Sequence, residues 1–154
     1  MWKKAVFVPC LVAILLIFGS TFCGCSGKTV ANGSEFKTEQ DAITSRFPKI
    51  GDFTACYWKA DAIGDSRLSI GPTPYWMKGF VVLGKDNFED LKKDFQWVRV
   101  DDSWNPSLDV SVLKENSFQW AICKAFDSYV MSSDYVGNFY LDFENGILFF
   151  DVQQ

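Results

Sequence analysis

Histidine is absent from this chain of 154 residues. Without an imidazole, the Ser-His-Asp and Cys-His catalytic groups, histidine zinc sites and histidine pH switches are all excluded. Arginine is scarce, with three residues, and the formal net charge is -4. Because a nucleic-acid partner requires a surface of clustered Lys and Arg, we expect no nucleic acid to bind.

Motifs for phosphate and metal ions are also missing from the chain. It has neither a Gly-rich phosphate loop nor the spaced acidic residues of an EF-hand calcium loop. The nearest approach to a metal site is the trio Asp101, Asp102 and Asp109, a weak set of oxygen ligands for calcium. We therefore expect no cofactor and no metal site.

The first quarter of the chain has the layout of a secretory signal. Lys3 and Lys4 precede an uncharged stretch over residues 5–27, whose apolar centre spans residues 11–18. A positively charged start, an apolar middle and an end of small residues are typical of a signal peptide. We therefore treat this part as a targeting segment rather than as part of the fold.

The end of this segment carries a lipidation motif. Phe22-Cys-Gly-Cys-Ser26 resembles the lipobox of bacterial lipoproteins, in which a cysteine after a small residue is acylated and becomes the mature N-terminus. Cys25 fits this role because Gly24 precedes it and Ser26 follows it. The resemblance implies a signal peptide over residues 1–24 and a lipid anchor on Cys25.

An uncleaved transmembrane helix is the alternative, since residues 5–25 could span about 30 Å of hydrocarbon at 1.5 Å per residue. Pro9 and the small residues at the end of the stretch disfavour it. In both cases Lys3 and Lys4 hold the N-terminus in the cytoplasm and the rest is translocated. We expect a protein on the extracytoplasmic face of a bacterial cell membrane, anchored there by lipid.

The rest of the chain is expected to be a tether over residues 25–37 and one domain over residues 38–154. Residues 28–37 are small, polar and without periodicity, as is usual in tethers. At the start of the domain, Thr38 suits a helix N-cap and Pro48 would stop the helix. We predict a short first helix between them.

After this helix, the sequence pattern predicts two strands and a second helix. Alternating residues predict a strand over residues 53–62, and an apolar run predicts another over residues 75–83. Asp86-Asn-Phe-Glu89 has the spacing of a capping box and predicts a helix, followed by a short strand over residues 96–100. Residues 107–131 fit helix and strand equally well.

The C-terminus predicts a hairpin. Asn145-Gly146 favours a two-residue type I′ turn between strands over residues 139–143 and 147–152. The turn would set Leu141 opposite Phe150 on an apolar face and leave the other face in solvent. The order of elements predicts an α+β fold, with a small antiparallel sheet and two or so helices on one face.

Several segments together resemble a group of known sequences. They are Asp65-Ser-Arg67, Gly71-Pro-Thr-Pro-Tyr-Trp76, the acidic helix ending at Trp97, and Gly137-Asn-Phe-Tyr-Leu-Asp142 before the closing hairpin. They are similar to segments of small uncharacterised bacterial lipoproteins, mostly from Gram-positive species. The resemblance covers most of the domain and implies a coherent fold, but it implies no activity.

The loop between the first two strands is the candidate ligand site. Arg67, beside Asp65, Tyr75 and Trp76, could hold a carboxylate or phosphate with two parallel hydrogen bonds. The alternative is that Asp65 and Arg67 only hold the loop together. We predict a ligand-binding site of Asp65, Arg67, Tyr75 and Trp76.

Two carboxylates on the hairpin raise the question of catalysis. Asp142 and Asp151 are expected as diagonal neighbours on the outer face, with Cα atoms about 7–8 Å apart. Paired carboxylates cleave glycosidic bonds, although a solvated sheet face also explains them. The sequence thus leaves two functions open: a non-catalytic binding or interaction module with an unknown ligand, or a carboxylate-dependent hydrolase of cell-envelope polymers.

Only two cysteines, Cys56 and Cys123, lie in the predicted domain. In an oxidising compartment they could form a disulfide worth about 3–4 kcal/mol by the loop-entropy model. Two buried free thiols are the alternative, and the sequence does not decide between them.

Overall fold

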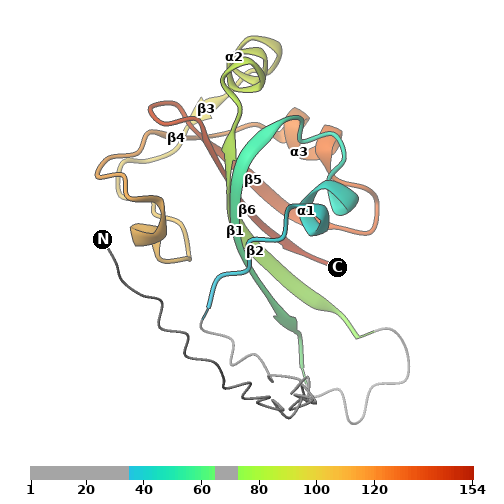
Figure 1. Cartoon of the computed structure of the whole chain (residues 1–154). Coiled ribbons are helices and arrows are strands. Elements are labelled where there is room, and N and C mark those ends of the chain that lie inside the picture. The colour runs from blue at the N-terminus through green and yellow to red at the C-terminus, as the bar shows by residue number, and fades with distance from the viewer. Residues whose placement is uncertain (1–34, 65–72) are drawn as a thin grey trace, which may run out of the picture. The chain divides into compact units, whose positions relative to one another are not determined.

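The computed structural model describes residues 35–64 and 73–154 (Figure 1). Within these residues, a six-stranded antiparallel sheet is combined with α-helices and one 3-10 helix. The elements in chain order are α1 (Gln40–Arg46), β1 (Phe53–Ala62), β2 (Tyr75–Leu83), α2 (Lys85–Asp94), β3 (Val98–Arg99), η1 (Val110–Leu113), β4 (Trp120–Ile122), α3 (Lys124–Val130), β5 (Val136–Asp142) and β6 (Ile147–Gln153). The α+β class predicted from the sequence is confirmed.

The strand order is β1-β2-β6-β5-β4-β3, so that β1 and β3 are the two edges of the sheet. The two long strands β1 and β2 have the bounds predicted from the sequence. They come unusually close at Gly79, which pairs with Trp58. A Cβ on residue 79 would lie 2.6 Å from the Cβ of Trp58, so only glycine fits at this point.

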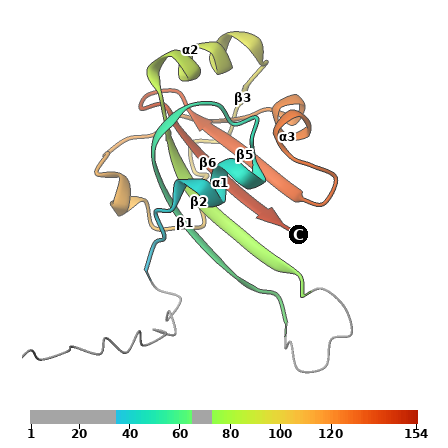
Figure 2. The ribbon, with the colours of Figure 1, turned by 45° about the vertical axis from the view of Figure 1, so that its right-hand side comes forward.

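Helices cover one face of the sheet, as predicted (Figure 2). Ile43 in α1 and Phe47, the residue that caps its C-terminus, lie four residues apart and are both fully buried. The core on this face draws on all three α-helices and on the central strands; among its members are Ile43, Phe47, Leu91, Phe126, Val130, Met77, Val81, Phe139, Leu141, Leu148 and Phe150. Packing in one shared apolar layer therefore holds the α-helices on this face of the sheet.

The opposite face of the sheet is buried too, and the expectation of a solvated outer face is wrong. Ile147 and Phe149 on this face are 3% and 1% exposed. They are covered by residues 100–118, the stretch that contains η1. The alternating apolar residues of this stretch do not form a strand but pack on the sheet; they are Leu108, Val110 and Val112. A second apolar layer thus forms, in part from the stretch after residue 106 that the sequence pattern left undecided.

The C-terminal hairpin forms, but its register differs by two residues from the prediction. Leu141 pairs with Leu148 rather than with Phe150. The connection has four residues, 143–146, instead of two, and only Gly146 in it has a positive φ, of 66°. A type I′ turn would require a positive φ at Asn145 as well. Because the shift is an even number of residues, Leu141 and Phe150 stay on the predicted face and are buried.

Neither predicted helix cap is used. The N-cap of α1 is Glu39 rather than Thr38, and the N-cap of α2 is Gly84, so Asp86 lies inside the first turn. There Asp86 still favours the helix, because a carboxylate interacts well with the positive end of the helix dipole. Asn87 instead has a tertiary role, since its side chain donates to the carbonyls of residues 50 and 52 at 3.0 and 2.9 Å.

The ambiguous stretch over residues 107–131 resolves into η1, β4 and α3. Asp109 caps η1, because its carboxylate accepts a hydrogen bond of 2.9 Å from the Ser111 N–H. The strand predicted over residues 96–100 is the two-residue β3, which pairs with β4. These short elements form one end of the sheet order.

The chain just before α1 is attached to the edge strand β1. Lys37 and Trp58 exchange two backbone hydrogen bonds, of 2.8 and 2.9 Å. The Lys37 Nζ also lies 4.7 Å from the Trp58 ring, and the Lys59 Nζ lies 4.5 Å from the Phe36 ring. Residues 36 and 37, expected as the end of the tether, are therefore part of the folded domain.

The two cysteines of the domain are free thiols, and both are buried. Cys56 is in β1 and Cys123 directly follows β4, so three strands lie between them. At about 4.8 Å per strand this is about 19 Å along the sheet, whereas a disulfide needs Cα atoms within about 7 Å. The candidate bridge is not formed, and burial raises the pKa of the Cys56 thiol.

Candidate functional site

The structure places only part of the ligand site predicted from the sequence. Asp65 and Arg67 lie outside the described residues. Tyr75 and Trp76 are neighbours on β2 and so point to opposite faces of the sheet. Tyr75 packs on the helix-covered side, and the Trp76 ring lies 6.0 Å from the Lys78 Nζ. A ligand on one face therefore cannot contact both aromatic residues.

Tyr75 takes part in an internal hydrogen-bond cluster. Its hydroxyl lies 2.9 Å from the Tyr135 hydroxyl and accepts a hydrogen bond of 3.3 Å from Arg46. Burial opposes ionisation of Tyr75, but the hydrogen bonds from Tyr135 and Arg46 outweigh it and lower the pKa. Burial and the hydrogen bond to Tyr75 raise the pKa of Tyr135 to about 12. The cluster joins α1, β2 and the segment before β5, which gives Tyr75 a structural role.

The two hairpin carboxylates do not form a catalytic pair. Asp142 pairs with Ile147, and Asp151 lies four residues further along β6. At about 3.4 Å per residue this separates them by about 14 Å, more than the about 5–9.5 Å between the carboxyl groups of glycosidases. The expected diagonal contact is wrong because it depended on the two-residue turn.

Both carboxylates are also occupied by partners within the protein. Asp151 forms an ion pair with Lys78 at 2.8 Å. Asp142 is fully buried and accepts four hydrogen bonds, from the backbone N–H groups of residues 119, 144 and 145 and from the side chain of Asn145. Four bonds use all the acceptor positions of a carboxylate. Asp142 thus holds the β5–β6 connection.

A groove at the β3 edge of the sheet is the candidate functional site. Three adjoining cavities meet there, and all three are lined by Arg99. One has a volume of about 200 Å³ and is lined by Trp97, Arg99, Gln119, Ala121 and Phe143. The second, of about 190 Å³, is lined by Arg99, Val100, Asp101, Asp102, Trp104, Phe118, Gln119 and Trp120. The third is a wide opening over residues 99–102. We call the whole the Arg99 groove.

The first compartment has aromatic walls that are held in place from behind. The indole N–H of Trp97 donates a hydrogen bond of 2.8 Å to the carbonyl of Leu91. The Trp97 ring also lies 5.2 Å from the Phe126 ring and 6.5 Å from the Phe143 ring. Because α2 and α3 support it in this way, Trp97 needs no rearrangement to present its ring to a ligand.

The second compartment is built in the same manner. Trp104 stacks on Tyr140 with ring centroids 4.1 Å apart and planes at 25°. Phe118 stacks on Trp120 with centroids 5.4 Å apart and planes at 17°. Such stacking contributes about 0.5–1.5 kcal/mol per pair beyond burial of area and fixes the ring planes. Both compartments are therefore rigid on their aromatic sides.

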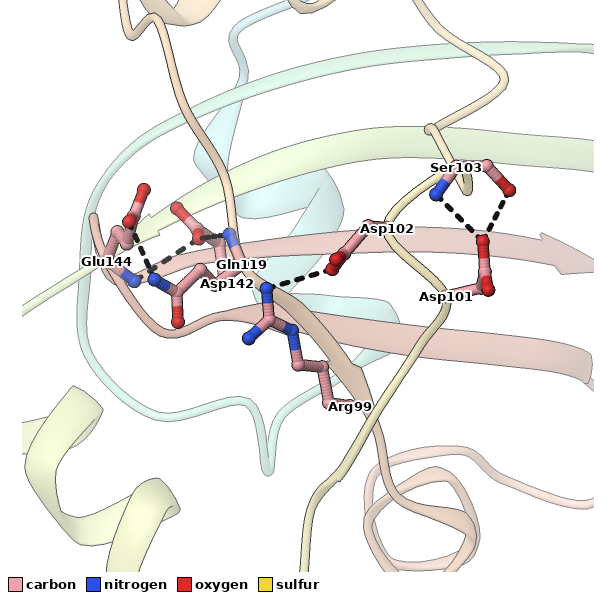
Figure 3. A network of polar contacts seen from close by, with 7 residues as sticks. All are labelled: Arg99, Asp101, Asp102, Ser103, Gln119, Asp142 and Glu144. Carbon is pink, nitrogen blue, oxygen red and sulfur yellow. Dashed lines mark hydrogen bonds and ion pairs between the residues drawn. The ribbon is translucent and has the colours of Figure 1, made fainter.

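Polar side chains form the rim between and around the compartments (Figure 3). Arg99 bonds Asp102 at 2.9 Å, and the Gln119 side chain donates to Glu144 at 2.8 Å. Asp101 accepts hydrogen bonds from the hydroxyl and N–H of Ser103, which lower the pKa of Asp101. Asp102 is thus the carboxylate paired with Arg99, whereas Asp101 and Glu144 are bonded to Ser103 and Gln119. On the side of the first compartment, the Lys92 Nζ lies 5.8 Å from the Phe143 ring.

The weak calcium set of the sequence does not assemble. Asp109 caps η1, and Asp101 is bonded to Ser103. Across residues 35–64 and 73–154, no group of three or more Cys, Asp or Glu side chains is placed to hold a metal ion. The groove itself is lined by polar and aromatic side chains.

Comparison of the chain with protein-family models, with curated proteins and with solved structures returned no match. In the part of the chain that the structure describes, no helix is both long enough and apolar enough to cross a membrane.

The Arg99 groove was not predicted from the sequence. Its residues come from β3, β4 and the β5–β6 connection, which are separated by about twenty residues or more along the chain. The sequence contained one indication of the groove, because aromatic residues are frequent on both sides of a polar loop. They are Trp97, Trp104, Phe118 and Trp120. The short strands that bring them together gave no pattern of their own.

Proposed function

We propose that the protein is a membrane-tethered, extracytoplasmic binding module that is not a catalyst, and that the Arg99 groove holds its ligand. One observation carries the proposal: fixed aromatic rings and polar side chains with unused hydrogen-bonding capacity surround the same cavities. Concave sites with aromatic walls and a few oriented polar groups are typical of ligand binding. Rigid walls lower the entropy lost on binding.

The tether is the second part of the proposal and depends on the sequence. The lipobox-like residues before Cys25 and the polar stretch after it support an anchor outside the cytoplasm. A binding domain held at the membrane needs only modest affinity, because the anchor raises its local concentration near envelope ligands. The two parts of the proposal are therefore compatible.

A hydrolase of envelope polymers is the less supported alternative. The carboxylates that suggested it are far apart, and Asp142 is used entirely for holding a turn. In the groove, hydrogen bonds from Ser103 stabilise the ionised form of Asp101, whereas a general acid needs a raised pKa. The groove is therefore better suited to binding than to acid catalysis.

Photo-cross-linking tests the proposal directly. A benzoylphenylalanine at position 119, on the rim of the groove, should capture ligand in the cells that make the protein. The same group at Lys93, exposed on α2 and outside the groove, serves as control. Adducts from position 119 and none from position 93 are expected. Equal labelling from positions 119 and 93 would show that the groove is not the site. So would labelling from a benzoylphenylalanine placed at Trp76 together with none from position 119.

A further inference from the structure

The aromatic walls of the two closed compartments belong to opposite faces of the sheet. Trp97 and Phe143 pack with the helix-covered core, whereas Trp104 and Phe118 pack with the second apolar layer. Each compartment is therefore a site of its own. The second compartment has a volume of about 190 Å³ and combines aromatic rings with acidic side chains.

The charged side chains that line the second compartment are two carboxylates and one guanidinium. Arg99 is paired with Asp102 at 2.9 Å, which leaves Asp101 as an additional carboxylate. Lys92 lies on the other side, because its Nζ is 5.8 Å from the ring of Phe143, which packs with the helix-covered core. The lining of the second compartment is therefore acidic by one charge.

Three side chains of this lining keep an oxygen that can accept a hydrogen bond from a ligand. Asp101 uses one carboxylate oxygen for both bonds from Ser103. Asp102 uses one for its bond from Arg99. The other oxygen of each carboxylate accepts no hydrogen bond from residues 35–64 and 73–154. Gln119 donates through its amide nitrogen to a carboxylate of the rim and keeps its side-chain carbonyl. These oxygens favour a ligand group that donates hydrogen bonds, and a positively charged donor is attracted by the carboxylates as well.

Aromatic rings supply a further attraction for a cation. Trp104 is stacked on Tyr140, and its own ring is half-buried. Phe118 is half-buried in the same way and is stacked on Trp120. The face of an aromatic ring carries partial negative charge and attracts a cation within about 6 Å of the ring centre. A cation in this compartment would therefore meet carboxylates and aromatic rings together.

We propose that the second compartment of the Arg99 groove binds a primary ammonium group at the end of an alkyl chain, with Asp101 and Asp102 as acceptors and the aromatic wall beside the chain. This inference rests on the proposed binding function and gives its ligand class. The side chain of lysine and a free diamine both carry such a group. The cavity of about 190 Å³ is large enough, since an apolar cavity of about 150 Å³ holds benzene. The wide opening over residues 99–102 leaves room for the rest of a larger ligand.

NMR titration of the purified full chain tests the inference. Nα-acetyl-lysine amide carries one side-chain ammonium and should shift the indole N–H signal of Trp104. Its Nε-acetylated form has the same chain without the charge and should leave the signal in place. The affinity of the charged amide should fall as salt is added, because salt screens exposed charges. Cadaverine is the comparison for the source of the group: the tighter ligand of the two indicates either a peptide or a free diamine. Equal shifts from the charged and the acetylated amide, or no shift from either amine at tens of millimolar, would overturn the inference.

Charge variants of the lining have expected effects of opposite sign. Asp101→Asn keeps an acceptor oxygen for Ser103 and should weaken binding of the amine roughly two- to fivefold, as for loss of an exposed ion pair. Arg99→Ala removes the competing cation from the lining and should strengthen binding by a similar factor. Asp90→Asn removes the same charge as Asp101→Asn from α2, outside the groove, and should change nothing. All three side chains are exposed, so an unchanged melting temperature shows that the fold is intact. Weaker binding by Arg99→Ala would mean that the guanidinium holds the ligand, as it would hold an anion, and would overturn the inference.

The outcomes separate this inference from the proposed binding function. Amines that leave the Trp104 signal in place, together with adducts from position 119, would overturn the ligand class and leave the binding function standing. Absence of adducts from position 119 would remove the binding function, and this inference with it.

Discussion

Asp142 fixes the end of the hairpin through its carboxylate. Three backbone N–H groups and one side-chain amide point at its two oxygens, from residues 119, 144 and 145. Without it, the backbone N–H groups of residues 119, 144 and 145 would lose an acceptor in a partly buried position, whereas the Asn145 amide would keep its bond to the Ser117 carbonyl. The carboxylate therefore joins β4 to the β5–β6 connection and positions Gln119 and Glu144 on the rim of the groove.

Asp142→Ala should lower the free energy of unfolding by roughly 3 kcal/mol, because several donors lose their acceptor at once. Asp142→Asn should cost less, roughly 1–2 kcal/mol, since the amide keeps one acceptor oxygen but turns an N–H₂ group toward Asn145. Urea denaturation measures both. A variant as stable as the original protein would show that these hydrogen bonds contribute nothing net.

Asp127 is a second buried carboxylate, with 4% of its surface exposed. It accepts a hydrogen bond of 2.7 Å from the N–H of Phe139 and lies 3.3 Å from the Lys124 Nζ. Burial raises its pKa above the ordinary value of 3.8, although these partners act in the opposite direction. The folded state therefore holds the proton more tightly than the unfolded state does.

The raised pKa of Asp127 sets the direction in which this group changes the stability of the protein with pH. Above pH 3.8 the unfolded chain releases the proton of Asp127 first, so the contribution of this group to stability falls as pH rises through the folded-state pKa. In Asp127→Asn the group does not titrate. Urea unfolding between pH 3 and 7 should show the stability of the variant rising relative to the original protein as pH increases. A constant difference, or one of opposite slope, would contradict the raised pKa.

The elements show how far the sequence determined the fold. Strands β1 and β2 follow directly from local patterns, because each spans nine or ten residues of continuous apolar or alternating character. The hairpin register does not, since the turn is set by Asp142 and by the bond from the Leu83 N–H to the Gly146 carbonyl, contacts that only the folded chain makes. These tertiary hydrogen bonds therefore outweigh the local preference of Asn145-Gly146 for a two-residue turn.

Phe150→Ala tests the buried face of the hairpin. Phe150 is fully buried and lies within 6 Å of Phe47 and Phe139, with centroid distances of 5.8 and 5.9 Å. Truncation should cost about 3–5 kcal/mol, as for other large core side chains. Val136→Ala on β5, at a residue 67% exposed, should change stability by less than about 0.5 kcal/mol. Thermal or urea unfolding of the two variants gives the comparison.

The candidate site was harder to predict than the fold for a related reason. A ligand site was predicted in the loop after β1 because charged, aromatic and proline residues are adjacent there in the sequence. The Arg99 groove is assembled from β3, β4 and the β5–β6 connection, and its two-residue and three-residue strands are too short to show a period. Adjacency in sequence was a poor guide to convergence in space.

At the scale of the whole molecule, the N-terminal lipid anchor is a prediction from the sequence. We expect the mature protein to begin at Cys25 with a diacylglyceryl group, because Gly24 and Ser26 give the lipobox-like setting. Mass spectrometry of the N-terminal peptide from native membranes measures this directly. Cys25→Ser should release the protein from the membrane fraction or leave it unprocessed, whereas Cys23→Ser should not. A peptide that still begins with Met1 would favour the uncleaved helix.

The attachment of residues 36 and 37 to β1 fixes where the chain enters the domain. The chain enters the domain at one edge of the sheet, and the Arg99 groove lies at the other edge, five strand spacings or about 24 Å away along the sheet. Because Lys37 and Trp58 share two hydrogen bonds, a pull on the anchor would be taken up at that edge and not at the groove. The sheet would then act as a short rigid arm that holds its open site away from the point where the chain is attached.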